Sequence, residues 1–173
     1  VYKRQVLFMK EIDVNFLEPS KQQLNDLQEY CQAGRYADAE KLSLSITQEF
    51  PEHQFAWKVL GAALKQMGKI NESLVASQKS VQLEPQDAEA HNNLGILLKE
   101  QGRLKEAEAS YRQAITLKPD FAEAHNNLGN TLKELGRLDE AEASFRQAIT
   151  LKPDYAEAHN NLGNTLQELG RLK

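Results

Sequence analysis

The sequence predicts an all-α protein, a right-handed superhelical α-solenoid of 34-residue helix-turn-helix repeats. The octapeptide AEAHNNLG occurs three times, and each copy begins 34 residues after the previous one. Glycines and prolines recur with the same spacing: Gly34, Gly68, Gly102, Gly136 and Gly170; Gly61, Gly95, Gly129 and Gly163; Pro51, Pro85, Pro119 and Pro153. A fixed period of this length is typical of stacked helical hairpins, because a single hairpin cannot bury its apolar face alone.

The period divides the chain into an amino-terminal extension and five repeats. The extension is residues 1–19, and the repeats are 20–53 (repeat 1, degenerate), 54–87 (repeat 2), 88–121 (repeat 3), 122–155 (repeat 4) and 156–173 (repeat 5, truncated after its first helix). Repeats 3 and 4 differ at only six positions, which indicates recent duplication. A residue that both copies share is therefore not independent evidence of function.

The start and end of the first helix are read from short-range signals in repeat 4. Asp120 precedes Glu123 by three residues, and this D-x-x-E spacing predicts a capping box at the helix start. Asp154 and Glu157 repeat the arrangement in repeat 5. At the other end, Gly136 can take the left-handed conformation that ends many helices.

The interior of repeat 4 follows from helical periodicity. The first helix carries apolar residues at i, i+4 and i+7, namely Leu128, Leu132 and Leu135. The second helix is expected to bury Ala141, Phe145, Ala148 and Ile149 and to stop before Pro153, whose ring prevents continuation. Each repeat is therefore expected to be a hairpin of two amphipathic helices.

Composition excludes several kinds of partner and cofactor. The formal charge of −4 comes from interleaved acidic and basic residues, so no basic surface is expected to attract nucleic acid. The single cysteine, Cys31, cannot form an internal disulfide, and no Cys/His spacing suits structural zinc, so no metal or other cofactor is expected. The apolar run from Val6 to Met9 is too short for a signal peptide or a membrane span. We therefore expect no membrane partner and a cytoplasmic location.

Residues at defined positions of the repeat show a family resemblance. Leu94, Gly95, Gly102, Ala107, Tyr111, Ala114 and Pro119 fall on the signature positions of the tetratricopeptide repeat family, which the sequence resembles over about residues 20–173. The first signature position, usually Trp in that family, is Trp57 in repeat 2 and His91, His125 and His159 in repeats 3 to 5. Repeat 1 departs from the pattern, because Leu27 stands where the family has a small glycine.

The three equivalent histidines could suggest a metal site, since imidazole is a common ligand. Equivalent positions on successive repeats are about 10 Å apart or more, however, while a shared zinc needs each nitrogen at about 2.0–2.1 Å. We therefore interpret the histidines as packing residues in the Trp position. The chain also has no phosphate loop, nucleophile elbow or HExxH spacing, so no active site is expected in it.

Asparagines give the strongest functional signal. Glu123, Asn127, Asn130 and Glu134 cluster on one face of the first helix, opposite the leucines, and each repeat from repeat 3 onward carries a double asparagine. Asparagine is a mediocre helix former, so its recurrence needs a reason. One interpretation is that the amides hold the backbone of an extended peptide, because each offers donors and an acceptor. The other is that they are solvated or form hydrogen bonds between repeats.

In the family resemblance, this face implies a concave peptide-binding groove. The candidate groove residues are Asn93, Asn127, Asn161, Asn130, Asn164, Glu89, Glu123, Glu157, Lys99 and Lys133. A second groove type of the family, the carboxylate clamp for chaperone tails, implies cations beside the asparagine pair. This sequence has Asn126 and Glu157 there, so an acidic tail is a disfavoured ligand.

The repeats resemble most specifically those of the bacterial and eukaryotic protein O-GlcNAc transferase (SPINDLY-like) group, in which a groove asparagine contacts the substrate polypeptide. Two functions follow as hypotheses. The chain is a protein-interaction module that binds an extended polypeptide, or it is the substrate-recruiting arm of a larger glycosyltransferase, sulfotransferase or methyltransferase whose catalytic domain lies beyond Lys173. The first helix of repeat 5 is also expected to leave Leu162, Leu166 and Leu169 partly uncovered and to permit self-association.

Overall fold

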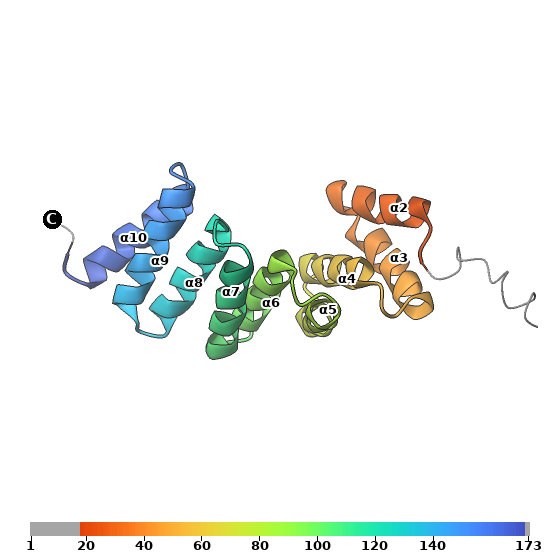
Figure 1. The fold of residues 1–173 in the computed structure, drawn as a ribbon, viewed down its shortest axis with the longest axis horizontal. Coiled ribbons are helices and arrows are strands. Elements are labelled where there is room, and N and C mark those ends of the chain that lie inside the picture. Colours follow the sequence, from red (N-terminus) through yellow and green to blue (C-terminus); the bar gives the residue numbers. More distant parts are fainter. Residues whose placement is uncertain (1–17, 172–173) are drawn as a thin grey trace, which may run out of the picture.

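The structure is a computed structural model that describes residues 18–171, and this part of the chain contains nine helices and no strand. The helices are α2 (Lys21–Gln32), α3 (Tyr36–Glu49), α4 (Gln54–Gln66), α5 (Ile70–Leu83), α6 (Ala88–Glu100), α7 (Leu104–Leu117), α8 (Ala122–Glu134), α9 (Leu138–Leu151) and α10 (Ala156–Glu168). They stack as successive hairpins along one axis (Figure 1). Most of the expected extension, with its apolar run, lies outside the described residues. The predicted all-α solenoid is confirmed.

Each hairpin turns at a glycine. Gly136 has a φ of +75°, and its N–H donates to the carbonyl of Lys133 (3.0 Å), while the N–H of Arg137 donates to the carbonyl of Leu132 (2.9 Å). This pair of bonds is the Schellman motif, which satisfies carbonyls at the helix end. The left-handed glycine expected at the end of the first helix is confirmed.

The predicted capping box in repeat 4 is wrong. Helix α8 begins at Ala122, and its N-cap is Phe121, whose side chain makes no capping hydrogen bond. Asp120 therefore lies one residue before the N-cap, where its carboxylate is not placed to accept from the first turn. Glu123 instead lies near the ammonium of Lys152, at 3.8 Å.

The predicted box in repeat 5 is wrong for the same reason. Tyr155 is the N-cap of α10, so Asp154 precedes the cap and Glu157 has no partner in a box. Repeat 3 shows what a shift of one residue changes. Asp87, the residue before repeat 3, follows Pro85 by two residues, whereas Asp120 follows Pro119 by one. Asp87 therefore stands at the N-cap of α6, where it accepts from the N–H of Ala90 at 3.0 Å.

The interior of the hairpins differs along the chain. In repeats 3 and 4 a ring from the second helix covers a glycine of the first: a Cβ placed at Gly95 would lie 2.6 Å from the ring of Tyr111, and one at Gly129 would lie 2.6 Å from that of Phe145. Both rings are buried. Repeat 1 reverses the sizes, because Leu27 stands at the glycine position and Ser43 at the ring position, and both are fully buried.

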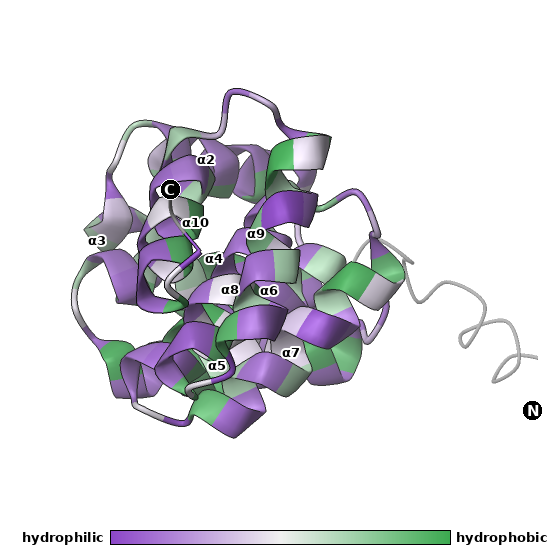
Figure 2. Ribbon diagram, turned by 90° about the vertical axis from the view of Figure 1, so that its left-hand side faces the viewer, coloured by the Kyte–Doolittle hydropathy of each residue, from purple (hydrophilic) through white to green (hydrophobic). Residues whose placement is uncertain are grey.

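The stack is curved, and the first helices lie on its inner side. The pairs α2 and α4, α4 and α6, α6 and α8, and α8 and α10 are in contact. Within residues 18–171 the backbones of successive second helices do not come this close, and α7 and α9 meet through long side chains such as Arg112 and Glu140 (3.5 Å). The closer approach of the first helices identifies their exposed side as the concave face. Figure 2, which views the stack from its carboxyl-terminal end, shows hydrophilic and hydrophobic residues alternating along these helices.

Helix α10 is less covered than its counterpart in repeat 4. Leu162 and Leu166 are half-buried, whereas the equivalent Leu128 and Leu132 are 4% and 1% exposed. A Cβ at Gly163 would meet no described atom within 4 Å. No helix between residues 18 and 171 combines the length and apolar character that crossing a membrane requires.

Candidate peptide-binding groove

Two of the predicted groove asparagines are joined to the repeat before them. The amide nitrogen of Asn127 donates to the side-chain oxygen of Asn92 (3.1 Å), and that of Asn161 donates to Asn126 (3.1 Å). The two acceptors are buried, at 7% and 0% exposure. Of the two interpretations of the double asparagine, hydrogen bonding between repeats is what the structure shows at these positions. Each donor amide still has a second N–H and its carbonyl oxygen.

The predicted acidic and basic groove residues are also paired. The three glutamates each contact a polar side chain: Glu89 with Lys58 (2.8 Å), Glu123 with Lys152 (3.8 Å) and Glu157 with Asn126 (3.0 Å). The two lysines each form an ion pair with the following repeat: Lys99 with Glu134 (2.7 Å) and Lys133 with Glu168 (2.8 Å). These contacts pair the charges of the predicted groove residues, and all of them except the contact of Glu123 with Lys152, which lies within repeat 4, connect neighbouring repeats.

Three predicted groove residues keep free amides. Asn93, Asn130 and Asn164 make no side-chain hydrogen bond within the part of the chain that the structure describes. Asn164 is exposed, and the other two are half-buried. They lie on the three consecutive first helices α6, α8 and α10, and we call them the open amides. The predicted asparagines thus fall into two sets. One is the asparagine ladder, in which Asn127 and Asn161 bond the preceding repeat, and the other is the open amides.

The junction between repeats 2 and 3 is built differently. Lys58 stands where later repeats have Asn92 and Asn126, and its ammonium lies 2.8 Å from both Asp87 and Glu89. Burial opposes the charge of Asp87, but the bonds from Lys58, the N–H of Ala90 and Gln54 outweigh it and lower its pKa. Burial likewise opposes the charge of Lys58, yet the two carboxylates raise its pKa. An ion-pair cluster replaces the asparagine ladder here.

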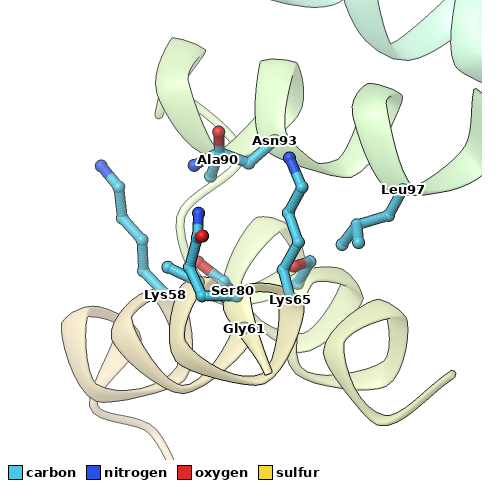
Figure 3. Close-up of a pocket in the computed structure, with 10 residues that line it drawn as sticks. Lys58, Gly61, Lys65, Ser80, Ala90, Asn93 and Leu97 are labelled. Atoms are coloured by element: carbon cyan, nitrogen blue, oxygen red, sulfur yellow. The ribbon is translucent and has the colours of Figure 1, made fainter. Parts of the chain in front are cut away.

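A cavity of about 110 Å³ lies at the same junction, between α4, α5 and α6 (Figure 3). Its lining is Lys58, Gly61, Ala62, Lys65, Gln66, Ser77, Ser80, Ala90, Asn93 and Leu97. Sequence reasoning missed this cavity. The signal that could have revealed it is Ser77, which stands at the position where repeats 3 and 4 have Tyr111 and Phe145.

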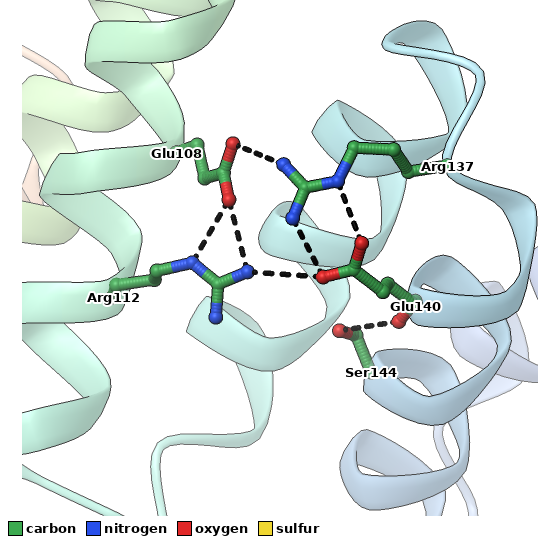
Figure 4. A network of polar contacts seen from close by, with 5 residues as sticks. All are labelled: Glu108, Arg112, Arg137, Glu140 and Ser144. Atoms are coloured by element: carbon green, nitrogen blue, oxygen red, sulfur yellow. Dashed lines mark hydrogen bonds and ion pairs between the residues drawn. The ribbon is translucent and has the colours of Figure 1, made fainter.

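A second feature that sequence reasoning missed is an ion-pair network away from the groove (Figure 4). Arg137 bonds Glu108 of the preceding repeat (2.7 Å) and Glu140 of its own helix α9 (2.6 Å), while Arg112 bonds the same Glu108 (2.9 Å). Burial raises the pKa of Glu108, but the two arginines more than offset that and hold the pKa below its ordinary value. The network therefore joins repeats 3 and 4.

The histidines take the local role of the tryptophan. The ring Nε2 atoms of His91, His125 and His159 lie 3.0, 3.0 and 2.9 Å from the carbonyl oxygen of the proline six residues earlier. Trp57 donates from Nε1 to the carbonyl of Pro51 at 2.8 Å. Each ring thus contacts its own inter-helix turn, and the three histidines do not converge on one another.

The stacked hairpins, the concave face formed by the first helices and the inter-repeat bonds define an α-helical repeat protein of the kind that serves as a protein-interaction module. A family model described as TPR repeat matches residues 61–102, 97–136 and 129–170. The chain belongs to the tetratricopeptide repeat family.

Solved structures agree with this fold. The structure titled MamA 41-end from Desulfovibrio magneticus RS-1 has a TM-score of 0.80 at 19% identity, over 87% of this chain and 85% of that one. A crystal structure of MamA gives a TM-score of 0.79 at 22% identity, over 84% and 85%. The first TPR of Spaghetti (RPAP3), bound to the HSP90 peptide SRMEEVD, gives 0.66 at 22% identity, over 68% and 93%. A search of curated proteins gave no significant match.

Proposed function

We propose that the concave face of this module binds an extended polypeptide segment, and that the open amides Asn93, Asn130 and Asn164 contact the backbone of that segment. The observation that carries the proposal is their lack of partners within residues 18–171, on a face where the other predicted groove residues are paired. A side-chain amide can donate and accept at once, so it can bind a peptide backbone whatever the side chains are.

The spacing of the repeats supports an extended ligand. Packed helices lie about 8–10 Å apart, and an extended chain advances about 3.3–3.6 Å per residue. One repeat therefore corresponds to about three residues of an extended segment. Two such spacings separate α6 from α10, so a segment of about seven residues or longer can contact the open amides of the three helices in turn.

The charges of the groove favour a segment without an acidic tail. Lys99 and Lys133 are each paired with a glutamate of the next repeat, so neither cation is available to a ligand without breaking that pair. Glu157 and Asn126 occupy the positions that a carboxylate clamp gives to cations. The neighbour that binds SRMEEVD is a precedent for peptide binding by this fold, and we propose a ligand of different charge here.

A matched pair of double variants tests the groove. Peptides are first selected against the whole chain from a random 12-residue display library, and their affinities are then measured for N130A/N164A and for Q113A/Q147A. Asn130 and Asn164 are open amides of the concave face, whereas Gln113 and Gln147 are exposed amides on the second helices α7 and α9. The first variant should lose at least tenfold in affinity and the second should be unchanged.

Two results contradict the proposal: a library that yields no binders, or binders that lose equal affinity with both variants. Neither variant removes a hydrogen bond of the fold, so circular dichroism should show both to be fully helical. A substrate-recruiting role beside a transferase domain, the resemblance to O-GlcNAc transferase repeats, and self-association through α10 stay predictions.

A further inference from the structure

The cavity between repeats 2 and 3 lies where a ring is missing. In repeat 3 the ring of Tyr111 covers Gly95, and burial together with the nearby carboxylates of Glu100 and Glu134 raises the pKa of this tyrosine. Repeat 2 keeps the glycine, Gly61, but has Ser77 in the ring position.

Ser77 fills only part of the space that a ring occupies. Its Oγ would lie 2.6 Å from a Cβ at Gly61, so the serine covers the glycine itself. Beyond it lies the cavity of about 110 Å³, bounded on the far side by Ala90, Asn93 and Leu97 of α6. Figure 3 shows Lys58 and Lys65 extending from α4 toward α6, which carries Asn93. The cavity opens on the concave face, because its lining includes Ala62, which is exposed on the first helix α4.

Two polar groups on the cavity wall have no partner in the described chain. Ser77 is 7% exposed, and its hydroxyl makes no hydrogen bond within residues 18–171. Asn93 is one of the open amides, because Lys58 replaces the asparagine that would accept from it. Neither polar atom is sealed inside the protein, because Asn93 is half-buried and the hydroxyl of Ser77 is not among the fully buried unpaired atoms. Both groups can therefore be reached from the cavity and can bond a polar group of a ligand that enters it.

We propose that this cavity receives one aromatic side chain of the tyrosine type from the bound polypeptide, in place of the ring that repeat 2 lacks. This inference rests on the proposed function, because the side chain belongs to the polypeptide that the groove is proposed to bind. The ring lies against Ser77 on one side and Ala62, Ala90 and Leu97 on the others, and its hydroxyl reaches the polar groups at the rim. An engineered cavity of about 150 Å³ takes up a whole benzene. The cavity here is smaller, about 110 Å³, but it is open, so a ring can enter it in part while its tip protrudes.

The charges at the rim favour an aromatic ring over a carboxylate. Asp87 and Glu89 already compensate Lys58, and Glu100 lies 3.9 Å from the ammonium of Lys65. An added carboxylate would have to compete with three acidic groups for two cations. An uncharged ring needs no such competition, because the face of the ring attracts an ammonium while that ammonium keeps its ion pair.

The same chain already uses lysine in this way. Lys118 lies over the ring of Phe121 with its ammonium 5.0 Å from the centroid, and Lys152 lies over the ring of Tyr155 at 4.9 Å. Both contacts involve a lysine whose side chain is exposed. Lys58 and Lys65 at the cavity rim can take equivalent positions over an incoming ring.

The test uses side-chain analogues as probes on the whole chain. p-Cresol represents tyrosine and propionate represents glutamate, and each is titrated while the amide resonances are followed by NMR. p-Cresol should cause saturable shifts at Gly61, Ser77 and Asn93, and propionate should not. The inference is overturned if p-cresol gives no saturable shift there, or if propionate binds the same residues as tightly.

Two variants locate the binding. Ala62 is exposed at the cavity mouth, and A62I installs the residue that repeat 3 has at this position, Ile96, so it should close the mouth and weaken p-cresol at least tenfold. A109I places the same side chain on an exposed site of α7 and should leave binding unchanged. Equal binding by both variants also overturns the inference. The probes do not depend on Asn130 or Asn164, so failure of the groove proposal would be seen separately, in the peptide affinities.

Discussion

Repeats 2 and 3 have the same helical hairpin but different interiors and different junctions to their neighbours. In repeat 3 a buried ring, Tyr111, covers Gly95, and an asparagine ladder leads on to repeat 4. In repeat 2 a serine covers Gly61, and an ion-pair cluster around Lys58 leads on to repeat 3. The helix positions thus tolerate an exchange of the contacts between repeats, and the exchange of a ring for Ser77 leaves a cavity beside the concave face.

The two junctions also differ in which asparagines bond the neighbouring repeat and which remain without a partner in the described chain. Where the ladder exists, its asparagines are used by the fold, and the amides one turn further along are free. Where it is absent, Asn93 itself becomes free and faces the cavity. The double asparagine therefore has different roles at different junctions, although its copies are identical in sequence: Asn127 bonds Asn92, whereas the equivalent Asn93 lines the cavity.

The largest expected effect comes from filling a covered glycine. In G129A the new Cβ would lie 2.6 Å from Phe145, whose ring is fully buried and cannot turn away. Overpacking of this kind costs about 1–3 kcal/mol, and we expect a loss near the upper end in urea unfolding. In G61A the neighbour is the Oγ of Ser77, which can rotate, so the loss should be smaller.

Gly163 is the control for this first prediction. It stands at the same repeat position, but a Cβ there meets no described atom within 4 Å. G163A should therefore gain up to about 1 kcal/mol from helix propensity alone. Equal effects of G129A and G163A on the unfolding free energy would show that the ring does not constrain the glycine.

Removing a ladder asparagine should have the next largest effect. Asn126 is fully buried and bonds both Glu157 and Asn161, so N126A leaves two polar groups without their partner. We expect a loss of about 1–3 kcal/mol in chemical unfolding. N93A removes a side chain without hydrogen bonds in the described chain and should change stability by no more than about 0.5 kcal/mol. Similar losses in the two variants would contradict the division into ladder and open amides.

The ion-pair cluster predicts a pH dependence that belongs to the junction of repeats 2 and 3. The lowered pKa of Asp87 means that its contribution is present above the unfolded value, about 4, and is lost as pH falls through the folded value. The raised pKa of Lys58 means that its contribution is present below the unfolded value, about 10.4, and is lost as pH rises through the folded value. The ion pair of Asp87 and Lys58 therefore stabilises the fold at all pH values between these two limits.

D87N tests this dependence while keeping a good N-cap residue. At pH 7 the variant should be less stable than the original chain by about 0.5–1 kcal/mol, and the difference should shrink as pH falls into the strongly acidic range. The measurement is urea unfolding at several pH values. A difference that stays constant down to strong acid would mean that the charge of Asp87 does not stabilise the junction.

The smallest effect is expected in repeat 1, where the sizes of the paired residues are reversed. The hydroxyl of Ser43 is fully buried and has no hydrogen-bond partner, so S43A should be neutral or stabilise the chain by up to about 1 kcal/mol. Ser73 is equally buried but donates to the carbonyl of Gly61 at 2.7 Å, so S73A should cost about 1 kcal/mol. Opposite signs in thermal or urea unfolding are the expected outcome.

The sequence by itself determined the repeat, through its 34-residue period, and the helices and turns within each repeat, because their ends depend on signals within a few residues. Gly136 ends its helix and Pro153 follows the next one by rules that involve only the local backbone. Even so, a shift of one residue decided capping: Asp87 reaches its N–H, whereas Asp120 does not.

Only the tertiary structure decided which polar residues remain available. Asn127 finds its acceptor 35 residues earlier in the chain, whereas Asn130, three positions further along the same helix, finds none in the described chain. Nothing in the local sequence distinguishes these two asparagines. Asn127 is paired because it lies on the side of α8 that meets Asn92 of α6. The cavity exists because Ser77 of repeat 2 is smaller than Tyr111, which stands at the same position of repeat 3.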